Sequence, residues 1–250
     1  MSAELRVRPL EGLPEVRPGD DLAALLAAAR GPEGFTPGEV LVVAHKVVSK
    51  AEGALRRLAD VEPSPRAVAL AASTGRKDPR HVQVVLDESV EVVRAAPHGV
   101  LICRTHHGFV CANAGVDASN AGRADVLVTL PRDPGASAAA LRAALPGRPA
   151  VVITDSFGRA WRHGQVDVAI GVAGLAPLED WRGRTDADGR ELHATWIAIA
   201  DEAAAAADLV RGKDARMPAV VISGLERHVT PETGSGAGAL VRPPEDDLFR

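Results

Sequence analysis

Short valine-rich apolar runs alternate along the chain with alanine- and leucine-rich stretches. Apolar β-branched runs bounded by Gly, Pro or Asp are typical of strands, whereas longer Ala/Leu stretches with a polar start favour helices. The runs predict strands beginning at Val7 and at 40–48, 90–94, 100–103, 126–130, 150–153, 167–174 and 219–223. The remaining pattern predicts helices at 21–30, 65–73, 78–89, 137–145 and 196–210. This mixture indicates an α/β class.

Local signals refine two of these predictions. Asp20 is a candidate N-cap for the first helix, and Thr195 is one for the last. The strand at 126–130, the helix at 137–145 and the strand at 150–154 form an expected βαβ unit, whose two strands would be parallel neighbours.

Composition excludes several classes of function. With 250 residues the chain can bury the core of one large domain or of two interlocked ones, and its 3% aromatic content leaves Val, Leu, Ala and Ile to fill it. A net charge of −4 gives no electrostatic case for nucleic acid. No apolar run approaches the roughly 20 residues that span a bilayer, so no membrane association is expected. The absence of a signal-like N-terminus and the count of only two cysteines predict a cytoplasmic protein.

The segment at 151–165 carries the most informative chemistry. An apolar strand is predicted to end at Asp155 and Ser156, and the loop beyond it holds Arg159 and Arg162. A carboxylate beside a hydroxyl suits a divalent cation, and the arginines suit the polyphosphate that such a cation accompanies. The alternative is an Asp/Ser helix cap followed by surface arginines, and the local sequence alone favours that alternative.

Cations interrupt the strand predicted at 40–48. His45 and Lys46 lie within it, and Lys50 follows. The lysines either point outward from an edge strand or face phosphate groups, and the local sequence does not decide between these interpretations.

Polar groups surround Gly115 in an otherwise apolar region. Asn113, Asp117, Ser119 and Asn120 either form an Asx turn or supply a second metal carboxylate and an amide for a nucleotide. Nearby cysteine and histidine side chains do not follow a recognised zinc spacing; these are Cys103, His106, His107 and Cys111.

A glycine-rich segment at 230–239 ends the informative part of the chain. Its backbone N–H groups could cradle an anion, although the same composition makes flexible linkers. It is no Walker A motif, because no Lys-Ser/Thr follows the glycines.

Taken together, these motifs resemble the γ-glutamyl ligase family of the deazaflavin coenzyme F420. The match runs in order over nearly the whole chain and is carried by residues 12–14, 47–53, 107–120 and 154–162, by Asp201-Glu202 and by Gly212-Lys213. The resemblance implies one ligase domain over residues 1–250, with an unusual mixed-sheet fold of two interlocked subdomains in a homodimer. Some relatives carry a further nitroreductase-like domain, which is not expected here.

The resemblance also implies ligands. GTP, L-glutamate and the F420 precursor would be substrates, with two divalent ions, Mg²⁺ or Mn²⁺, and K⁺ as cofactors. Residues at matching positions imply metal ligands at Asp117, Asp155, Ser156 and, in the glycine-rich segment, Glu232. They imply nucleotide contacts at Gly12, Leu13, Pro14, Glu15, His45, Lys46, Lys50, Asn120, Gly234, Ser235 and Gly236.

The implied reaction passes through an acyl phosphate. A carboxylate must be activated before an amine can attack it, and phosphoryl transfer from GTP achieves this without a protein nucleophile. Asp155, Asp117 and Lys50 are therefore the candidate catalytic residues. The alternatives are a sister ligase that uses another acidic cofactor, a metal-dependent nucleotide phosphohydrolase and a non-catalytic nucleotide-binding subunit.

Overall fold

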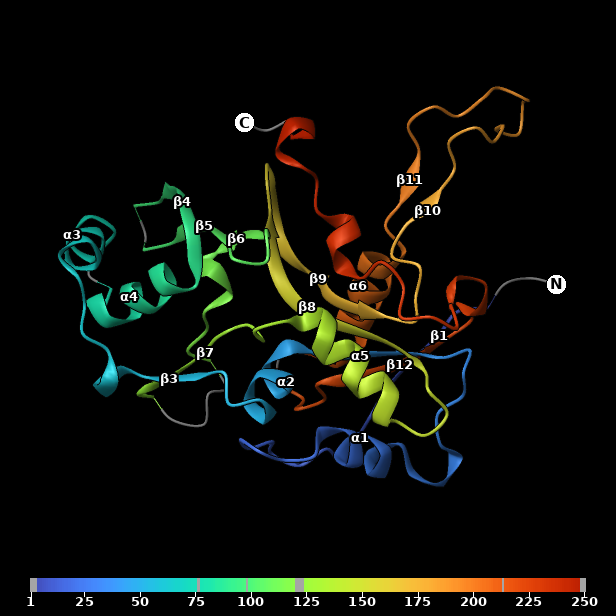
Figure 1. Cartoon of the computed structure of the whole chain (residues 1–250), viewed down its shortest axis with the longest axis horizontal. Coiled ribbons are helices and arrows are strands. Elements are labelled where there is room, and N and C mark those ends of the chain that lie inside the picture. The colour runs from blue at the N-terminus through green and yellow to red at the C-terminus, as the bar shows by residue number, and fades with distance from the viewer. Residues whose placement is uncertain (1–3, 76, 98, 120–123, 213, 248–250) are drawn as a thin grey trace.

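A five-stranded mixed sheet forms the centre of the larger part of the molecule (Figure 1). The computed structural model describes residues 4–75, 77–97, 99–119, 124–212 and 214–247. The strand order is β1 (Arg6–Pro9), β12 (Ala219–Ser223), β2 (Val40–Ala44), β8 (Ala150–Arg159) and β9 (Arg162–Ala173). Among the described strand pairs of this sheet, β2–β8 is the parallel one, and the other three are antiparallel. The predicted mixed α/β class is therefore confirmed.

Helices cover both faces of this sheet. On one face, Leu41 and Ile153 pack with α1 (Leu22–Arg30), α2 (His45–Ala51) and α5 (Pro134–Ala144). On the other face, Val42 and Val152 pack against α6 (Ile199–Arg211). Side chains alternate between the faces of a strand, so a strand buried on both faces reads as a continuous apolar run.

A smaller part of the chain has its own core. It consists of the sheet β4 (Ser89–Ala95), β5 (Leu101–Thr105) and β6 (Val110–Ala112) with the helices α3 (Pro65–Ser73) and α4 (Pro79–Asp87). The chain enters through β3 (Leu55–Arg57) and returns through β7 (Val126–Val128), and these two strands pair with each other. Short 3₁₀ helices complete the structure: η1 (Gly31–Glu33), η2 (Leu58–Asp60), η3 (Asn113–Gly115), η4 (Glu226–His228), η5 (Ala237–Leu240) and η6 (Pro244–Asp246).

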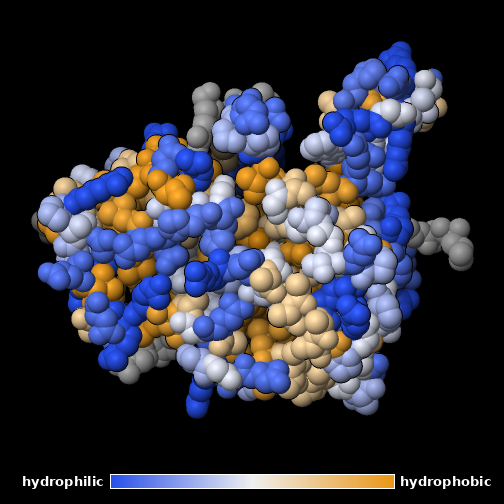
Figure 2. All heavy atoms as spheres, in the orientation of Figure 1, coloured by the Kyte–Doolittle hydropathy of each residue, from blue (hydrophilic) through white to orange (hydrophobic). Residues whose placement is uncertain are grey.

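A hairpin arm projects from the body at the end of β9 (Figure 1). Its base is the pair β10 (Glu179–Asp180) and β11 (Trp196–Ile197). Arg182 lies 4.3 Å above the Trp196 ring. Most of the arm's visible surface is hydrophilic (Figure 2). Among the described residues, no helix is both long and apolar enough to cross a membrane.

Several predicted elements are confirmed. The helix predicted at 65–73 is α3, and the strands predicted at 90–94, 100–103 and 219–223 are β4, β5 and β12. The first helix is capped by Asp21 rather than Asp20, because the Asp21 carboxylate accepts a hydrogen bond from the Ala24 N–H.

Other predictions were wrong. The strand predicted at 40–48 ends at Ala44, where α2 begins and directs Val47 and Val48 into the core. The strand at 126–130 is no neighbour of β8, because β7 pairs with β3 and the parallel partner of β8 is β2. The expected βαβ unit is therefore absent.

Two boundaries also differ. β8 does not end at Asp155 but continues to Arg159, because β9 pairs with it along its whole length. The last helix begins at Ile199 rather than Trp196, because Trp196 belongs to β11, and Ala198 rather than Thr195 is its N-cap.

Candidate active site

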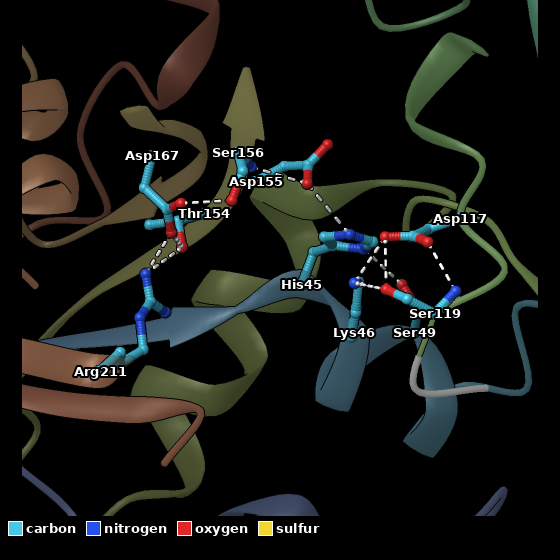
Figure 3. A network of polar contacts seen from close by, with 10 residues as sticks. All are labelled: His45, Lys46, Ser49, Asp117, Ser119, Thr154, Asp155, Ser156, Asp167 and Arg211. Carbon is cyan, nitrogen blue, oxygen red and sulfur yellow. Dashed lines mark hydrogen bonds and ion pairs between the residues drawn. The ribbon is translucent and has the colours of Figure 1, made fainter. Parts of the chain in front are cut away.

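The candidate site forms where β2 gives way to α2. Ala44, the last residue of β2, pairs with Thr154 of β8. Because these strands are parallel, the residues that follow each of them meet at the same edge of the sheet. His45 therefore lies beside Asp155, and Lys46, the next residue, lies beside Asp117 and Ser119, as Figure 3 shows.

His45 is buried against the carboxylate of Asp155. Its side chain is only 2% exposed, and its Nε2 lies 3.3 Å from Asp155 Oδ1 without the alignment of a hydrogen bond. Its Nδ1 lies 3.2 Å from Ser49 Oγ. Asp155 Oδ1 also accepts the Ser156 N–H at 2.8 Å. The Asp155 carboxylate is thus held on the α2 face of the sheet.

Asp117 reaches the same region from the segment that returns from the smaller part of the chain. Lys46 Nζ lies 2.6 Å from Asp117 Oδ2 and donates to Ser119 Oγ at 2.8 Å. The Ser119 N–H and hydroxyl both donate to the Asp117 carboxylate. Burial raises the pKa of Asp117, but the Lys46 and Ser119 hydrogen bonds outweigh it, so the net pKa is lowered. Asp117 is therefore ionised at neutral pH.

Thr154 and Ser156 point to the opposite face, where a buried network receives them (Figure 3). Ser156 Oγ donates to Asp167 Oδ1 at 2.6 Å, and Thr154 Oγ1 donates to Asp167 Oδ2 at 2.9 Å. Arg211 pairs with Asp167 and also donates to Thr154 Oγ1 at 3.1 Å. Asp167 and Arg211 were not predicted from the sequence, because their proximity depends on the β8–β9 register and on α6. The only local signal was a polar residue at the start of an apolar run.

Several residues that were predicted to contact the nucleotide lie on α2 or in the segment at 12–15. Lys50 is buried, and its Nζ donates to Glu15 Oε1 at 2.5 Å. Gly12 has a φ of 77°, which favours glycine, and Leu13 packs against the core beside it. Pro14 and Glu15 line an open surface pocket. Asn120 lies outside the described residues.

The glycine-rich segment is fastened to the end of β9. Gly174 donates to the Thr233 carbonyl and accepts from the Thr230 N–H, both at 2.9 Å. Gly236 approaches the Val172 carbonyl. Val172 is separated from Val168, the partner of Asp155, by roughly 13 Å of strand. Gly234 and Ser235 are exposed, as is Glu232, and the observed anchors of this segment lie away from Asp155.

The donor chemistry of the site fits a hard divalent cation. No three Asp, Glu, His or Cys side chains form a ready metal-binding group within the described ranges. Asp117 and Asp155 nevertheless supply carboxylate oxygens near His45 and Lys46 at the start of α2. Ser156 adds a hydroxyl oxygen, whose proton is donated to Asp167 on the opposite face of the sheet. Oxygen donors of this kind suit Mg²⁺ or Mn²⁺.

The nearby cysteines and histidines have other partners. Cys103 and Cys111 lie opposite each other on β5 and β6 and are buried. Burial raises the pKa of Cys111 to about 12, and the Asp155 carboxylate adds to the effect. His106 and His107 each place Nε2 against backbone carbonyl oxygens.

Comparison with known proteins identifies the family. Residues 12–224 match the F420-0:Gamma-glutamyl ligase family. The "Coenzyme F420:L-glutamate ligase" of Methanothermobacter thermautotrophicus is 46% identical over 96% of this chain and 97% of its own length. The protein of the same name from Methanopyrus kandleri is 47% identical over 98% of each chain, and that of Halobacterium salinarum is 48% identical over 87% of this chain and 86% of its own. This chain therefore belongs to the F420-0:gamma-glutamyl ligase family and is an enzyme of the ligase class.

Proposed function

We propose that this ligase joins L-glutamate to the F420 precursor through an amide bond, with GTP as the energy source. Relatives that are 46–48% identical carry the name of this glutamate ligase. The observation that carries the proposal is that Asp117 and Asp155, far apart in sequence, both reach the start of α2, where they contact Lys46 and His45 respectively. A site with two carboxylates and a bound lysine suits a nucleotide polyphosphate and its cations.

The reaction proceeds in two steps. An oxygen of the acceptor carboxylate forms a bond to the γ-phosphorus of GTP, and the bond from that phosphorus to the bridging oxygen breaks, which releases GDP. The amine of L-glutamate then attacks the acyl carbon, the carbon–oxygen bond to the phosphoryl group breaks, and phosphate and a proton leave. The acyl phosphate replaces an oxide leaving group by phosphate, so no protein nucleophile is required.

The chain's own residues position these groups. Asp117, Asp155 and Ser156 would hold the divalent ions, with Glu232 as the further ligand that the family resemblance implies. When bound, such ions offset the charge that develops on the phosphates. Lys50 binds a phosphate oxygen in place of Glu15, whose side chain is 64% exposed and free to move aside.

Lys46 keeps Asp117 ionised and in place, and His45 limits the movement of Asp155. Around the nucleotide, Gly12 to Glu15, Asn120 and the segment Gly234–Ser235–Gly236 complete the proposed contacts. The resemblance also supports a K⁺ requirement and a homodimer as parts of this proposal.

One assay tests the proposal. The protein is incubated with GTP, Mn²⁺, K⁺, L-glutamate and the deazaflavin acceptor, and the acceptor is analysed by mass for an added glutamyl residue. Replacement of K⁺ by Na⁺ should lower the rate. Phosphate release without any acceptor would instead indicate a phosphohydrolase. Turnover only with a different acidic acceptor would indicate a sister ligase, and GTP binding without turnover a non-catalytic subunit.

A further inference from the structure

A lysine without a carboxylate partner lies in the smaller part of the chain, just before α4 (Figure 1). Lys77 is half-buried, and its Nζ donates to Asn113 Oδ1 at 2.9 Å. Burial lowers the pKa of Lys77, because the charged ammonium loses solvation. Within the part of the chain that the structure describes, no carboxylate pairs with Lys77. A negative charge from outside the chain would therefore be stabilised here.

The neighbouring groups do not neutralise this ammonium. The Asp78 carboxylate caps α4 and pairs with Arg80, whose Nη2 lies 2.7 Å from Asp78 Oδ2. Burial raises the pKa of the Cys103 thiol, so this neighbour is neutral at pH 7. Asn113 is a neutral amide, and its Oδ1 also accepts the Leu101 N–H at 3.1 Å. A partly desolvated cation whose described partners are neutral is unfavourable, which points to an anionic ligand.

A histidine with an unused ring nitrogen lies close to the lysine. His81, on the first turn of α4, has a buried Nε2 with no hydrogen-bond partner among the described residues. Burial lowers the pKa of His81 and the Lys77 charge lowers it further, whereas Asp78 and Asp117 act in the opposite direction. His81 is therefore neutral at pH 7 and lies within electrostatic range of both Lys77 and Asp117. A neutral imidazole can donate one hydrogen bond through Nε2.

The turn η3, which packs against α4, links these groups to the candidate site. Its three residues all have positive φ, of 52° at Asn113, 53° at Ala114 and 73° at Gly115. Positive φ is strained for the asparagine and the alanine, and such strain is concentrated at functional sites. Lys77 binds the first residue of this turn, and Asp117 follows two residues after its end. The lysine is thus anchored beside the segment that carries Asp117.

We propose that Lys77 and His81 bind a carboxylate of L-glutamate. The proposed reaction uses the amine of L-glutamate, so both of its carboxylates stay negatively charged and need partners near the reacting atoms. The acceptor carboxylate does not fit this role, because it becomes an acyl phosphate during the reaction. An ammonium and a neutral imidazole N–H can donate together to one carboxylate. This inference rests on the proposed function, because that function supplies the glutamate.

Lys77→Met tests the inference, because methionine keeps an apolar stem and removes the charge. The KM for L-glutamate should rise by about 10–100-fold, as expected for the loss of a hydrogen bond between charged groups. The KM values for GTP and for the acceptor should not change. Lys77→Arg, which keeps the charge, should restore part of the affinity for L-glutamate.

Two amides of L-glutamate identify the bound carboxylate. L-Glutamine lacks the γ-carboxylate and L-isoglutamine lacks the α-carboxylate. The wild type should discriminate against the amide that lacks the bound group, and Lys77→Met should lose this discrimination. Undiminished discrimination against both amides in Lys77→Met would overturn the inference.

Arg80→Met is the matched control. Arg80 is a cation of the same segment, but Asp78 already pairs with it, so its loss should leave the KM for L-glutamate unchanged. Thermal unfolding tests for a purely structural role of Lys77. Lys77→Met should keep wild-type stability, because the Leu101 N–H still binds Asn113. A lower melting temperature with an unchanged KM for L-glutamate would overturn the inference. If Lys77→Met does not fold, Lys77→Gln, which can still donate to Asn113, takes its place.

Calorimetric titration separates this inference from the proposed reaction. L-Glutamate is titrated into the wild type and into Lys77→Met in the presence of GDP and Mn²⁺, without turnover. Equal affinity in both proteins would overturn the inference, as would a change of KM confined to the acceptor or to GTP. If Lys77→Met weakens glutamate binding but the wild type forms no glutamyl product, only the proposed reaction is wrong. If product forms but neither affinity nor KM for L-glutamate depends on Lys77, only the inference is wrong.

Discussion

Two adjacent residues at the end of β8 serve opposite faces of the sheet. Asp155 faces His45 and α2, whereas Ser156 faces Asp167 and α6. The sequence alone identified both as polar residues after an apolar run, which is a local signal. It could not predict their buried partners, because those partners depend on strand register and on residues far away in the chain.

The Asp155→Asn variant tests the charge of the carboxylate. The amide oxygen can still accept the Ser156 N–H, so the fold should be retained while the negative charge is lost. We expect ligation to fall by about 100-fold or more, because electrostatic groups of active sites have effects of this size. Glutamyl addition measured by mass and a thermal unfolding curve report the two properties. Wild-type turnover at ordinary Mg²⁺ concentrations would refute the metal role.

Lys50 tests the nucleotide contact. Its buried ammonium donates to the exposed Glu15 carboxylate, and a phosphate oxygen can take that position. A hydrogen bond between charged groups contributes about 1.5–3 kcal/mol, so Lys50→Ala should raise the KM for GTP by about 10–100-fold. Glu15→Gln, which weakens the resting pair but keeps Lys50, shows how much of the effect comes from that pair. An unchanged KM in Lys50→Ala would contradict the phosphate contact.

At the scale of elements, packing decided where the local pattern was ambiguous. Val47 and Val48 favour a strand by propensity, yet they lie in α2 because that helix turns them into the core beside α1 and β8. In α3 the Ser64 cap, the proline at the first turn and the alanine-rich sequence all agree, and its predicted bounds are confirmed. The local signals agree in α3, which was predicted correctly, and conflict in α2, which was predicted as a strand.

The contact between α6 and β9 gives a prediction on pH. The β9 strand has an irregular register near Thr154, and there the Ala169 N–H donates to Asp201 Oδ1 at 2.8 Å. Burial raises the pKa of Asp201 despite this hydrogen bond. The folded protein therefore holds this proton more tightly, and ionisation of Asp201 lowers stability as pH rises from the unfolded-state pKa, about 3.9, through the folded-state pKa.

Asp201→Asn should remove this pH dependence. The amide oxygen can still accept from Ala169, so the free energy of unfolding at pH 7 should equal or exceed that of the wild type, and the difference should vanish below about pH 4. Asp201→Ala leaves the Ala169 N–H unpaired and should cost about 1–3 kcal/mol. Urea denaturation at several pH values measures both. A large loss of stability in Asp201→Asn at pH 7 would show that its charge is stabilising.

At the scale of the whole molecule, the site depends on the return of the chain from a separate core. Asp117 follows η3 and forms a backbone bridge to Val128 just before the chain re-enters the larger part. Lys46 of α2 pairs with it although the two residues are 71 positions apart in sequence, and no local pattern encodes this pairing. The family resemblance implied both Asp117 and Lys46 as site residues. The residues alone left two roles open for Asp117, an Asx turn or a metal ligand. Ser119 does form that turn with Asp117, so both interpretations describe the same carboxylate.

The projecting arm gives the prediction for the assembly. An isolated two-stranded hairpin is at best marginally stable in water, and this one exposes half of the Trp196 side chain. Coverage of the arm by a second copy would provide the missing packing, in agreement with the proposed homodimer. Light scattering should therefore give a mass of about 52 kDa, twice the 26.0 kDa of the chain. A mass of one chain at micromolar concentration would rule out a stable homodimer, and the arm would then depend on contacts within one chain, among them the Arg182–Trp196 stacking and the Asp180 hydrogen bonds.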